Sequence, residues 1–318
     1  MHNKTAVIAI GGNSLIKDPK NVTTESQYQA ATETTFHIAD MIEGGWNVAI
    51  GHGNGPQVGF ILQRSEIAFK STDKVHEAPL DVCGAESQGF IGYFLQQTLQ
   101  NELFKRKIQK NVATIVTQVL VDKNDVAFKN PTKPIGGFMG EEEAKKRADE
   151  QGWVVREDSG RGWRRVVASP IPQEVVELDS VKALIDAGVI VITVGGGGIP
   201  VINSEDGAYF GTAAVIDKDY ASSLLAREIK ADLFIISTAV EKVALNFGKP
   251  DQVWLDHLTL AEAKQYLANG THFAKGSMAP KMQAIIWYLE AGGKEAIITN
   301  PENIGRALRG ETGTHIVS

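Results

Sequence analysis

Short apolar runs alternate with longer amphipathic segments along most of the chain. Apolar runs occupy residues 5–10, 46–52, 189–194, 232–237 and 295–299. Continuous apolar character over this length is typical of strands that are buried on both faces, as in a parallel sheet covered by helices. Strands that alternate with helices along the chain indicate the same architecture. We therefore expect an α/β fold with a mostly parallel central sheet.

The segments between these runs are expected to be mainly helical. The expected helices are residues 23–43, 55–68, 84–103, 173–187, 213–229 and about 280–291. Residues 111–121 alternate like one longer strand, and a final helix and strand complete the chain.

Residues 122–168 break this rhythm. Proline, glycine and charged residues are dense there, and apolar periodicity is weak. Trp153, Trp163 and the run 164–167 nevertheless offer material for a small sheet. We interpret the stretch as an inserted subdomain rather than a linker.

Composition narrows the class of function. A net charge of −6 without a long basic run gives little support for a nucleic-acid groove. The longest apolar runs are too short to span a bilayer, so no membrane segment is expected. The single cysteine, Cys83, fits a reducing compartment, and we expect a cytoplasmic protein. The seven histidines lack metal-site spacing, so a metal would arrive with the substrate.

Three glycine-rich loops follow expected strands: Gly11-Gly12-Asn13, Gly53-Asn54-Gly55 and residues 195–198. Ligands bind beyond the carboxyl ends of parallel strands, where glycine lets a ligand approach the backbone closely. Neither the P-loop pattern nor the dinucleotide pattern G-x-G-x-x-G is present. One Gly-Gly pair alone indicates only a tight turn. Three such loops in one sheet favour a site for a small planar anion or a transferring phosphoryl group.

Two lysines lie at expected helix starts. Lys218 stands between Asp217 and Asp219, and Lys281 follows Pro280. A cation opposes the helix macrodipole at this end unless an anion neutralises it. Each lysine alone is also explained as a solvated charge, but beside glycine loops they indicate an anionic substrate. Lys133 lies between two prolines, which stiffen the backbone and direct its side chain outwards.

The segments "IAIGGNS", "GHGNGPQVG", "NPTKP", "AVIDKD" and "HFAKGSMAPK" occur in one order along the chain. With them, the whole sequence resembles the carbamate kinases of the amino acid kinase superfamily. The resemblance implies a three-layer α/β/α sandwich, with residues 1–318 as a single domain and 122–168 as a protruding subdomain within it. It implies a homodimer and the reaction ATP + carbamate ⇌ ADP + carbamoyl phosphate, with Mg²⁺ carried on the nucleotide. In this family the reaction commonly makes ATP during arginine or purine-derivative catabolism.

The resemblance also implies roles for individual residues. Lys218 and Lys281 would neutralise the phosphates, Asp217 would orient those lysines, and Lys133 would reach in from the protruding subdomain. The residues expected to hold carbamate and the transferring phosphate are Gly11, Gly12, Asn13, Gly53 and Asn54. The residues expected to line the nucleotide site are Gly276, Ser277, Met278 and Ala244.

Three other functions remain open from the sequence. A kinase of another small carboxylate would keep the lysines and change only the first-strand pocket. A nucleotide-binding regulator without turnover is disfavoured, because Lys133, Asp217, Lys218 and Lys281 are all present. Nicotinamide chemistry is disfavoured by the glycine spacing.

Overall fold

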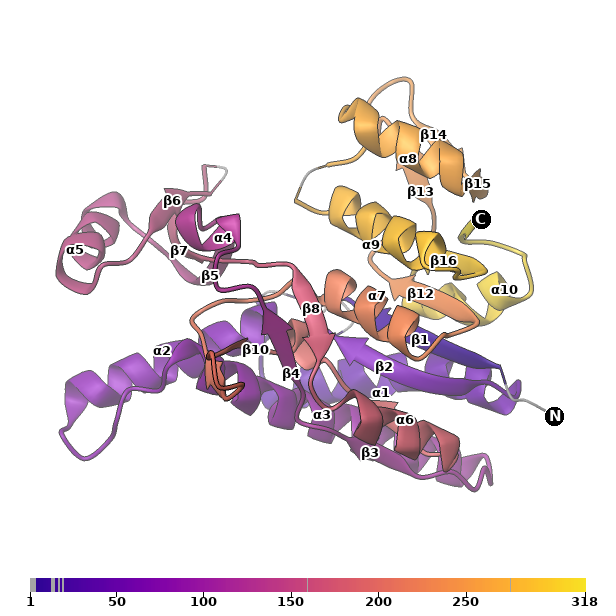
Figure 1. The fold of residues 1–318 in the computed structure, drawn as a ribbon, viewed down its shortest axis with the longest axis horizontal. Helices are drawn as coiled ribbons and strands as arrows, with labels where there is room; N and C mark the ends of the chain where they lie inside the picture. The colour runs from indigo at the N-terminus through magenta and orange to yellow at the C-terminus, as the bar shows by residue number, and fades with distance from the viewer. Residues whose placement is uncertain (1–3, 13–14, 17, 19, 159, 275) are drawn as a thin grey trace.

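The structure is a computed structural model that describes residues 4–318 except 13–14, 17, 19, 159 and 275. Its centre is an eight-stranded sheet, in which the six strands from β16 to β3 are parallel and β17 runs antiparallel to β16 (Figure 1). In spatial order the strands are β15 (His257–Thr259), β17 (Thr314–Val317), β16 (Glu295–Thr299), β12 (Leu233–Ser237), β1 (Thr5–Ile10), β2 (Asn47–His52), β9 (Ile190–Ile192) and β3 (Val112–Thr114). The mostly parallel sheet expected from the apolar runs is confirmed.

Helices cover both faces of this sheet. One face packs against α6 (Leu178–Asp186), α7 (Lys218–Glu228), α8 (Leu260–Asn269) and α9 (Met278–Glu290). The other packs against α1 (Thr24–Glu43), α3 (Leu80–Lys105) and α10 (Ile304–Leu308). Strand β1 shows why its sequence is continuously apolar. Val7 and Ala9 belong to the first core, whereas Ile8 and Ile10 belong to the second.

A second sheet of four strands continues from the large one. Its spatial order is β11 (Tyr209–Gly211), β10 (Ile199–Asn203), β4 (Gln118–Val121) and β8 (Pro172–Val175). The prediction of one strand over 111–121 is therefore wrong, because β3 and β4 belong to different sheets. The helix expected over 173–187 is also wrong at its start, where β8 pairs with β4. The helix expected from 213 begins only at Lys218, where Asp217 caps it.

Residues 126–158 and 160–167 form a separate unit beside the large sheet (Figure 1). It holds the three-stranded sheet β5 (Lys133–Met139), β7 (Trp163–Val167) and β6 (Val155–Glu157), with α4 (Val126–Lys129) and α5 (Glu141–Gln151). The unit rests on α2 (Gly55–Ser71), where Arg147 Nη1 donates to Glu66 at 3.0 Å. The Trp153 ring contacts two guanidinium groups, with its centroid 4.7 Å from Arg147 Cζ and 4.6 Å from Arg165 Cζ.

Two elements near the carboxyl terminus were not expected from the sequence. Helix α8 begins with a capping box between Thr259 and Glu262. The hairpin β13 (Val243–Leu245) and β14 (Val253–Leu255) precedes it.

Short 3-10 turns lie at Gly195–Gly197 and Pro301–Asn303. Within the described part of the chain, no helix has the length and apolar character that crossing a membrane requires.

Candidate active site

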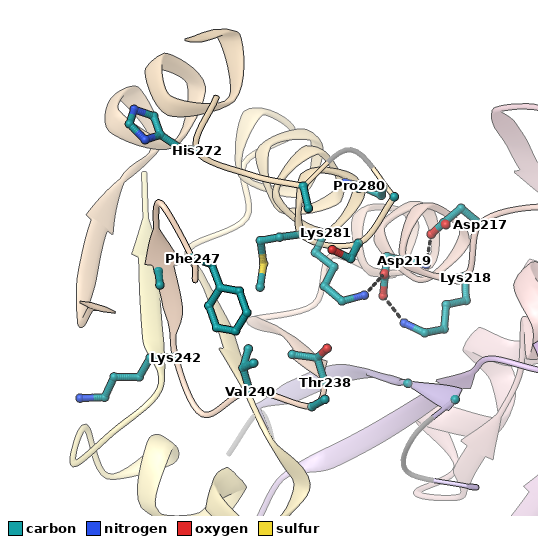
Figure 2. A pocket seen from close by; sticks show the side chains of 18 residues that line it. Asp217, Lys218, Asp219, Thr238, Val240, Lys242, Phe247, His272, Pro280 and Lys281 are labelled. Atoms are coloured by element: carbon teal, nitrogen blue, oxygen red, sulfur yellow. Dashed lines mark hydrogen bonds and ion pairs between the residues drawn. The ribbon is translucent and has the colours of Figure 1, made fainter. Parts of the chain in front are cut away.

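The candidate site lies where the carboxyl ends of β1 and β12 face the amino-terminal ends of α7 and α9. The chain leaves β1 towards β2 on one side and returns to β12 on the other, and such a reversal of strand order creates a crevice. A cavity of about 390 Å³ occupies this place (Figure 2). Its lining residues are Gly11, Gly12, Asp217, Lys218, Asp219, Thr238, Ala239, Val240, Lys242, Ala244, Phe247, His272, Ala274, Gly276, Ser277, Met278, Pro280 and Lys281.

One carboxylate gathers the two lysines of the helix starts. Lys281 Nζ donates to Asp219 Oδ2 at 2.8 Å, and Lys218 Nζ donates to Asp219 Oδ1. Figure 2 shows the two ammonium groups reaching Asp219 from different sides. The Asp219 side chain is 3% exposed, and those of Lys218 and Lys281 are 13% and 14% exposed. Three charged groups in this small volume leave one net positive charge, which an anionic ligand would neutralise.

The protonation of this cluster follows from burial and from the mutual charges. Burial alone would raise the pKa of Asp219, but Lys218 and Lys281 outweigh it and hold that pKa below its usual range. Burial is also the largest effect on Lys218, where it lowers the pKa, and repulsion from Lys281 adds to it against the attraction of Asp219. The cluster therefore contains an ionised carboxylate and a lysine whose charge is stabilised less than in water.

Asp217 connects the site to the separate three-stranded unit. Its Oδ1 accepts a hydrogen bond from the Asp219 amide at 2.9 Å and so caps α7. Its Oδ2 accepts from Lys133 Nζ at 3.0 Å. The predicted orienting partner of Lys218 and Lys281 was Asp217, but the structure gives both contacts to Asp219. The motif "DKD" offers two aspartates, and the cap geometry that distinguishes them is visible only once α7 is built.

The first two glycine loops border the charged cluster. Gly11 and Gly12 line the cavity, and a methyl group at Gly53 would lie 3.1 Å from Lys218 Cδ and 3.6 Å from the Gly12 nitrogen. The Gly11 amide donates to Ser237 O and the Gly53 amide to Ile10 O, at 3.0 and 2.9 Å. These two amides are therefore used by neighbouring strands, and the glycines contribute close approach instead. Asn13, the third residue of the first loop, lies outside the described residues.

The third glycine loop does not face the cavity. Gly195 to Gly198 are all buried, and a methyl group at Gly196 would lie 2.2 Å from Asn54 Nδ2. The Asn54 amide itself donates to Ser87 Oγ at 2.7 Å, and the residue is 6% exposed. The expectation that this loop forms part of a ligand site is wrong, because protein atoms fill the space beside it. Asn54 directly follows Gly53, which borders the charged cluster, but the Asn54 amide faces the protein interior.

The far end of the cavity carries both apolar and polar side chains. Ala244, Gly276, Ser277 and Met278, predicted for a nucleotide site, all line this cavity. Phe247, on the turn between β13 and β14, also lines it and is 63% exposed. Figure 2 shows Phe247, Val240 and Lys242 at this end, away from Lys218 and Lys281. Sequence reasoning missed Phe247, although an aromatic residue directly before Gly248 was a usable signal.

Sequence and structure comparisons with known proteins identify the family of this chain. The sequence model of the amino acid kinase family matches residues 4–300. Carbamate kinase of Clostridium perfringens is 50% identical over 313 residues, which cover 98% of this chain and 99% of that protein. The chain belongs to the carbamate kinases of the amino acid kinase family.

Two further relatives show the range of this similarity. A carbamate kinase-like protein of Escherichia coli is 51% identical over 99% of both chains. The structure of carbamate kinase from Giardia lamblia bound to AMP-PNP has 42% identity and a TM-score of 0.92 over 99% of both chains. The α/β/α sandwich implied by the motifs is thereby confirmed.

Proposed function

We propose that this chain catalyses reversible phosphoryl transfer between ATP and carbamate, giving ADP and carbamoyl phosphate. The observation that carries the proposal is the pair of lysines, Lys218 and Lys281, that both contact buried Asp219 in the wall of the cavity, where Gly11 and Gly12 also lie. Full-length similarity to carbamate kinases supports the same substrate pair. The AMP-PNP bound to the Giardia lamblia enzyme is consistent with a nucleotide in the cavity.

The proposed mechanism needs charge stabilisation more than proton transfer. A carbamate oxygen attacks the terminal phosphorus of ATP, and the bond from that phosphorus to the bridging oxygen of ADP breaks. The nucleophile is already an anion, so no general base is required. Lys218 and Lys281 stabilise charge on the transferring group, and Lys133 approaches from the three-stranded unit. We place Gly11, Gly12, Asn13 and Gly53 on the carbamate side, where Asn54 supports the loop through its bond to Ser87. We place Ala244, Gly276, Ser277 and Met278 on the nucleotide side.

We further propose Mg²⁺ as the metal that accompanies the nucleotide. Asp217 and Asp219 are each held by a lysine ammonium, and the described residues contain no cluster of three His, Cys, Asp or Glu that could bind a metal. This donor set fits a cation held by phosphate oxygens, where it would neutralise phosphate charge. Lys218 and Lys281 would then stabilise the remaining negative charge of the phosphates.

The wider setting follows from the family resemblance. We propose a cytoplasmic enzyme that makes ATP from carbamoyl phosphate in arginine or purine-derivative catabolism. We also propose that residues 1–318 are one domain with 122–168 as its inserted subdomain, and that Lys133 couples the two. The ion pair between Lys133 and Asp217 supports this coupling.

A homodimer is the proposed assembly. Strand β3 lies at one edge of the large sheet, and helices α1 and α3 carry exposed apolar side chains. Phe36, Tyr93 and Phe104 are 48%, 56% and 82% exposed. Apolar surface of this kind is typical of a face that a second copy covers. Sedimentation velocity of the purified chain tests this assembly.

The deciding experiment measures ATP formation from MgADP and fresh carbamoyl phosphate. We expect Lys218→Ala and Lys281→Ala to lower kcat by about 10²–10³, because each removes one preorganised charge at the transferring group. Lys264→Ala is the matched control, since Lys264 pairs with Glu290 on exposed surface and should leave kcat unchanged. A loss below about tenfold in both lysine variants, with folding intact, contradicts their assigned roles.

The same assay separates the alternatives. Similarity to a carbamate kinase-like protein is as high as to the carbamate kinases, so another small carboxylate is the second candidate substrate. Faster turnover with acetate or an N-acetyl amino acid than with carbamate would establish it. ADP binding without turnover of any acyl phosphate would favour a regulator.

A further inference from the structure

Two chain segments leave the large sheet side by side and enter the four-stranded sheet together. Strand β3 continues into β4, and β9 continues into β10, while β3 pairs with β9 and β4 with β10. The second crossing contains Val194 and the buried glycines 195–198. Val194 has a φ of 46°, a left-handed conformation that is unfavourable for a β-branched residue. Such a conformation persists only where the surroundings hold it.

A buried polar network holds this crossing. The Thr117 hydroxyl accepts a hydrogen bond from the Val194 amide at 3.2 Å and donates to Ile115 O at 2.8 Å. Gln88 Oε1 accepts from the Thr117 amide at 2.8 Å, and Gln88 Nε2 donates to Thr117 O and Gly195 O at 3.0 and 2.9 Å. Thr117 and Gln88 are 0% and 1% exposed. Without the Thr117 hydroxyl the Val194 amide would lose its hydrogen bond in the interior, and without Gln88 the Gly195 carbonyl would keep only the bond from the Gly198 amide.

The braced glycines support the loop on the carbamate side of the site. A methyl group at Gly195 would lie 2.4 Å from His52 Nε2, so the imidazole rests directly on that backbone. His52 Nδ1 bonds Gly53 O at 3.0 Å, and burial lowers the pKa of His52 to about 4. The neutral ring therefore donates from Nδ1 to that carbonyl. Asn54 packs on Gly196, so both neighbours of the Gly53 peptide are located by the braced loop.

We propose that Thr117 is a positioning residue for the carbamate side of the active site. Its hydroxyl keeps Val194 left-handed, which places Gly195 and Gly196 under His52 and Asn54. Those two side chains then set the Gly53 loop against Lys218. The proposal rests on the proposed function, because it assigns the Gly53 loop to the acyl substrate. The proposal predicts that losing the Thr117 hydroxyl weakens the binding of carbamoyl phosphate. The binding of ADP, which we place at the opposite end of the cavity, should not change.

The test compares Thr117→Val with Thr117→Ser in the full chain. Valine removes the hydroxyl at nearly constant volume, whereas serine keeps it. We expect Thr117→Val to raise KM for carbamoyl phosphate about tenfold or more, to leave the calorimetric Kd for MgADP within about twofold, and to be largely reversed by Thr117→Ser. Thr98→Val is the matched control, because Thr98 is a buried threonine of α3 that contacts Thr35 away from the site. Equal changes in KM and in the Kd for ADP, or an equal defect in both Thr117 variants, overturn the proposal.

A second measurement does not depend on turnover. Amide hydrogen exchange over residues 53–58 should be faster in Thr117→Val than in the parent chain, and unchanged in Thr98→Val. If carbamoyl phosphate is not a substrate, this readout still tests the brace while the proposed function fails. If Thr117→Val does not fold, Ser87→Ala removes the acceptor of the Asn54 amide and should produce the same faster exchange. Unchanged exchange in a folded variant overturns the positioning role.

Discussion

The glycines of this protein serve two opposite purposes at neighbouring strand ends. Gly12 and Gly53 border the charged cluster, and a methyl group at Gly12 would have no heavy-atom neighbour within 4 Å. A methyl group at Gly197 would lie 2.4 Å from the Ile216 carbonyl oxygen, and Gly197 has a φ of 95°. The first loop leaves room for a ligand at Gly12, whereas the third loop is packed against protein atoms. Glycine content alone does not distinguish a binding loop from a packing loop.

The neighbours of each loop explain the difference. Beside Gly53 lies Lys218, a long side chain whose charged end the carboxylate of Asp219 holds. Beside the third loop lie His52, Asn54 and Gln88, which are all at most 6% exposed. Bulky buried polar groups need backbone partners close by, and glycine lets the backbone come near enough. The third loop is therefore part of the support for the second loop, at Gly53.

Alanine at Gly197 should give the largest effect. The methyl group would meet backbone, which cannot move aside easily, and a left-handed alanine adds strain. We expect Gly197→Ala to lower the free energy of unfolding by about 3 kcal/mol or more, measured by denaturant titration. Gly12→Ala is the control and should change stability by less than about 0.5 kcal/mol while lowering turnover. Similar stability losses in the two variants would remove the distinction between open and packed loops.

The second-largest expected effect is a loss of stability at low pH, caused by His52 beside the packed loop. Burial lowers the pKa of His52 to about 4 from 6.5. Above pH 6.5 the His52 ring is neutral in both the folded and the unfolded state. Its protonation therefore costs the folded protein no stability at those pH values. Between pH 6.5 and 4 only the unfolded state binds the proton, and stability falls by roughly 3 kcal/mol over that interval.

Unfolding titrations at pH 7 and pH 4.5 measure this effect. His52→Gln removes the titrating group, so its stability should fall less between the two pH values than that of the parent chain. An identical fall in both proteins would show that other groups cause the acid sensitivity. The packed loop would then differ from the open loops only in its steric contacts, and not in its sensitivity to acid.

The sequence predicted the central sheet well because its strands are buried on both faces. Runs such as 5–10 and 232–237 need no tertiary information to be recognised. Residues 111–121 differ, since both halves look like strand and only tertiary pairing separates them at Thr117. The lysines were located by their helix starts. The choice of Asp219 over Asp217 as their partner depends on side-chain directions that a sequence pattern does not contain.

The smallest expected effect lies in the open loop itself. A methyl group at Gly53 would press on Lys218 Cδ, part of a flexible chain that can move by a few tenths of an ångström. The fold should therefore tolerate Gly53→Ala, but the ammonium of Lys218 would shift from Asp219 and from the transferring group. We expect turnover to fall about tenfold with little change in unfolding free energy. Gly55→Ala, where a methyl group has no neighbour within 4 Å, is the matched control. Loss of stability in Gly53→Ala would show that this glycine, like Gly197, is required for packing, so that open and packed loops would differ only in degree.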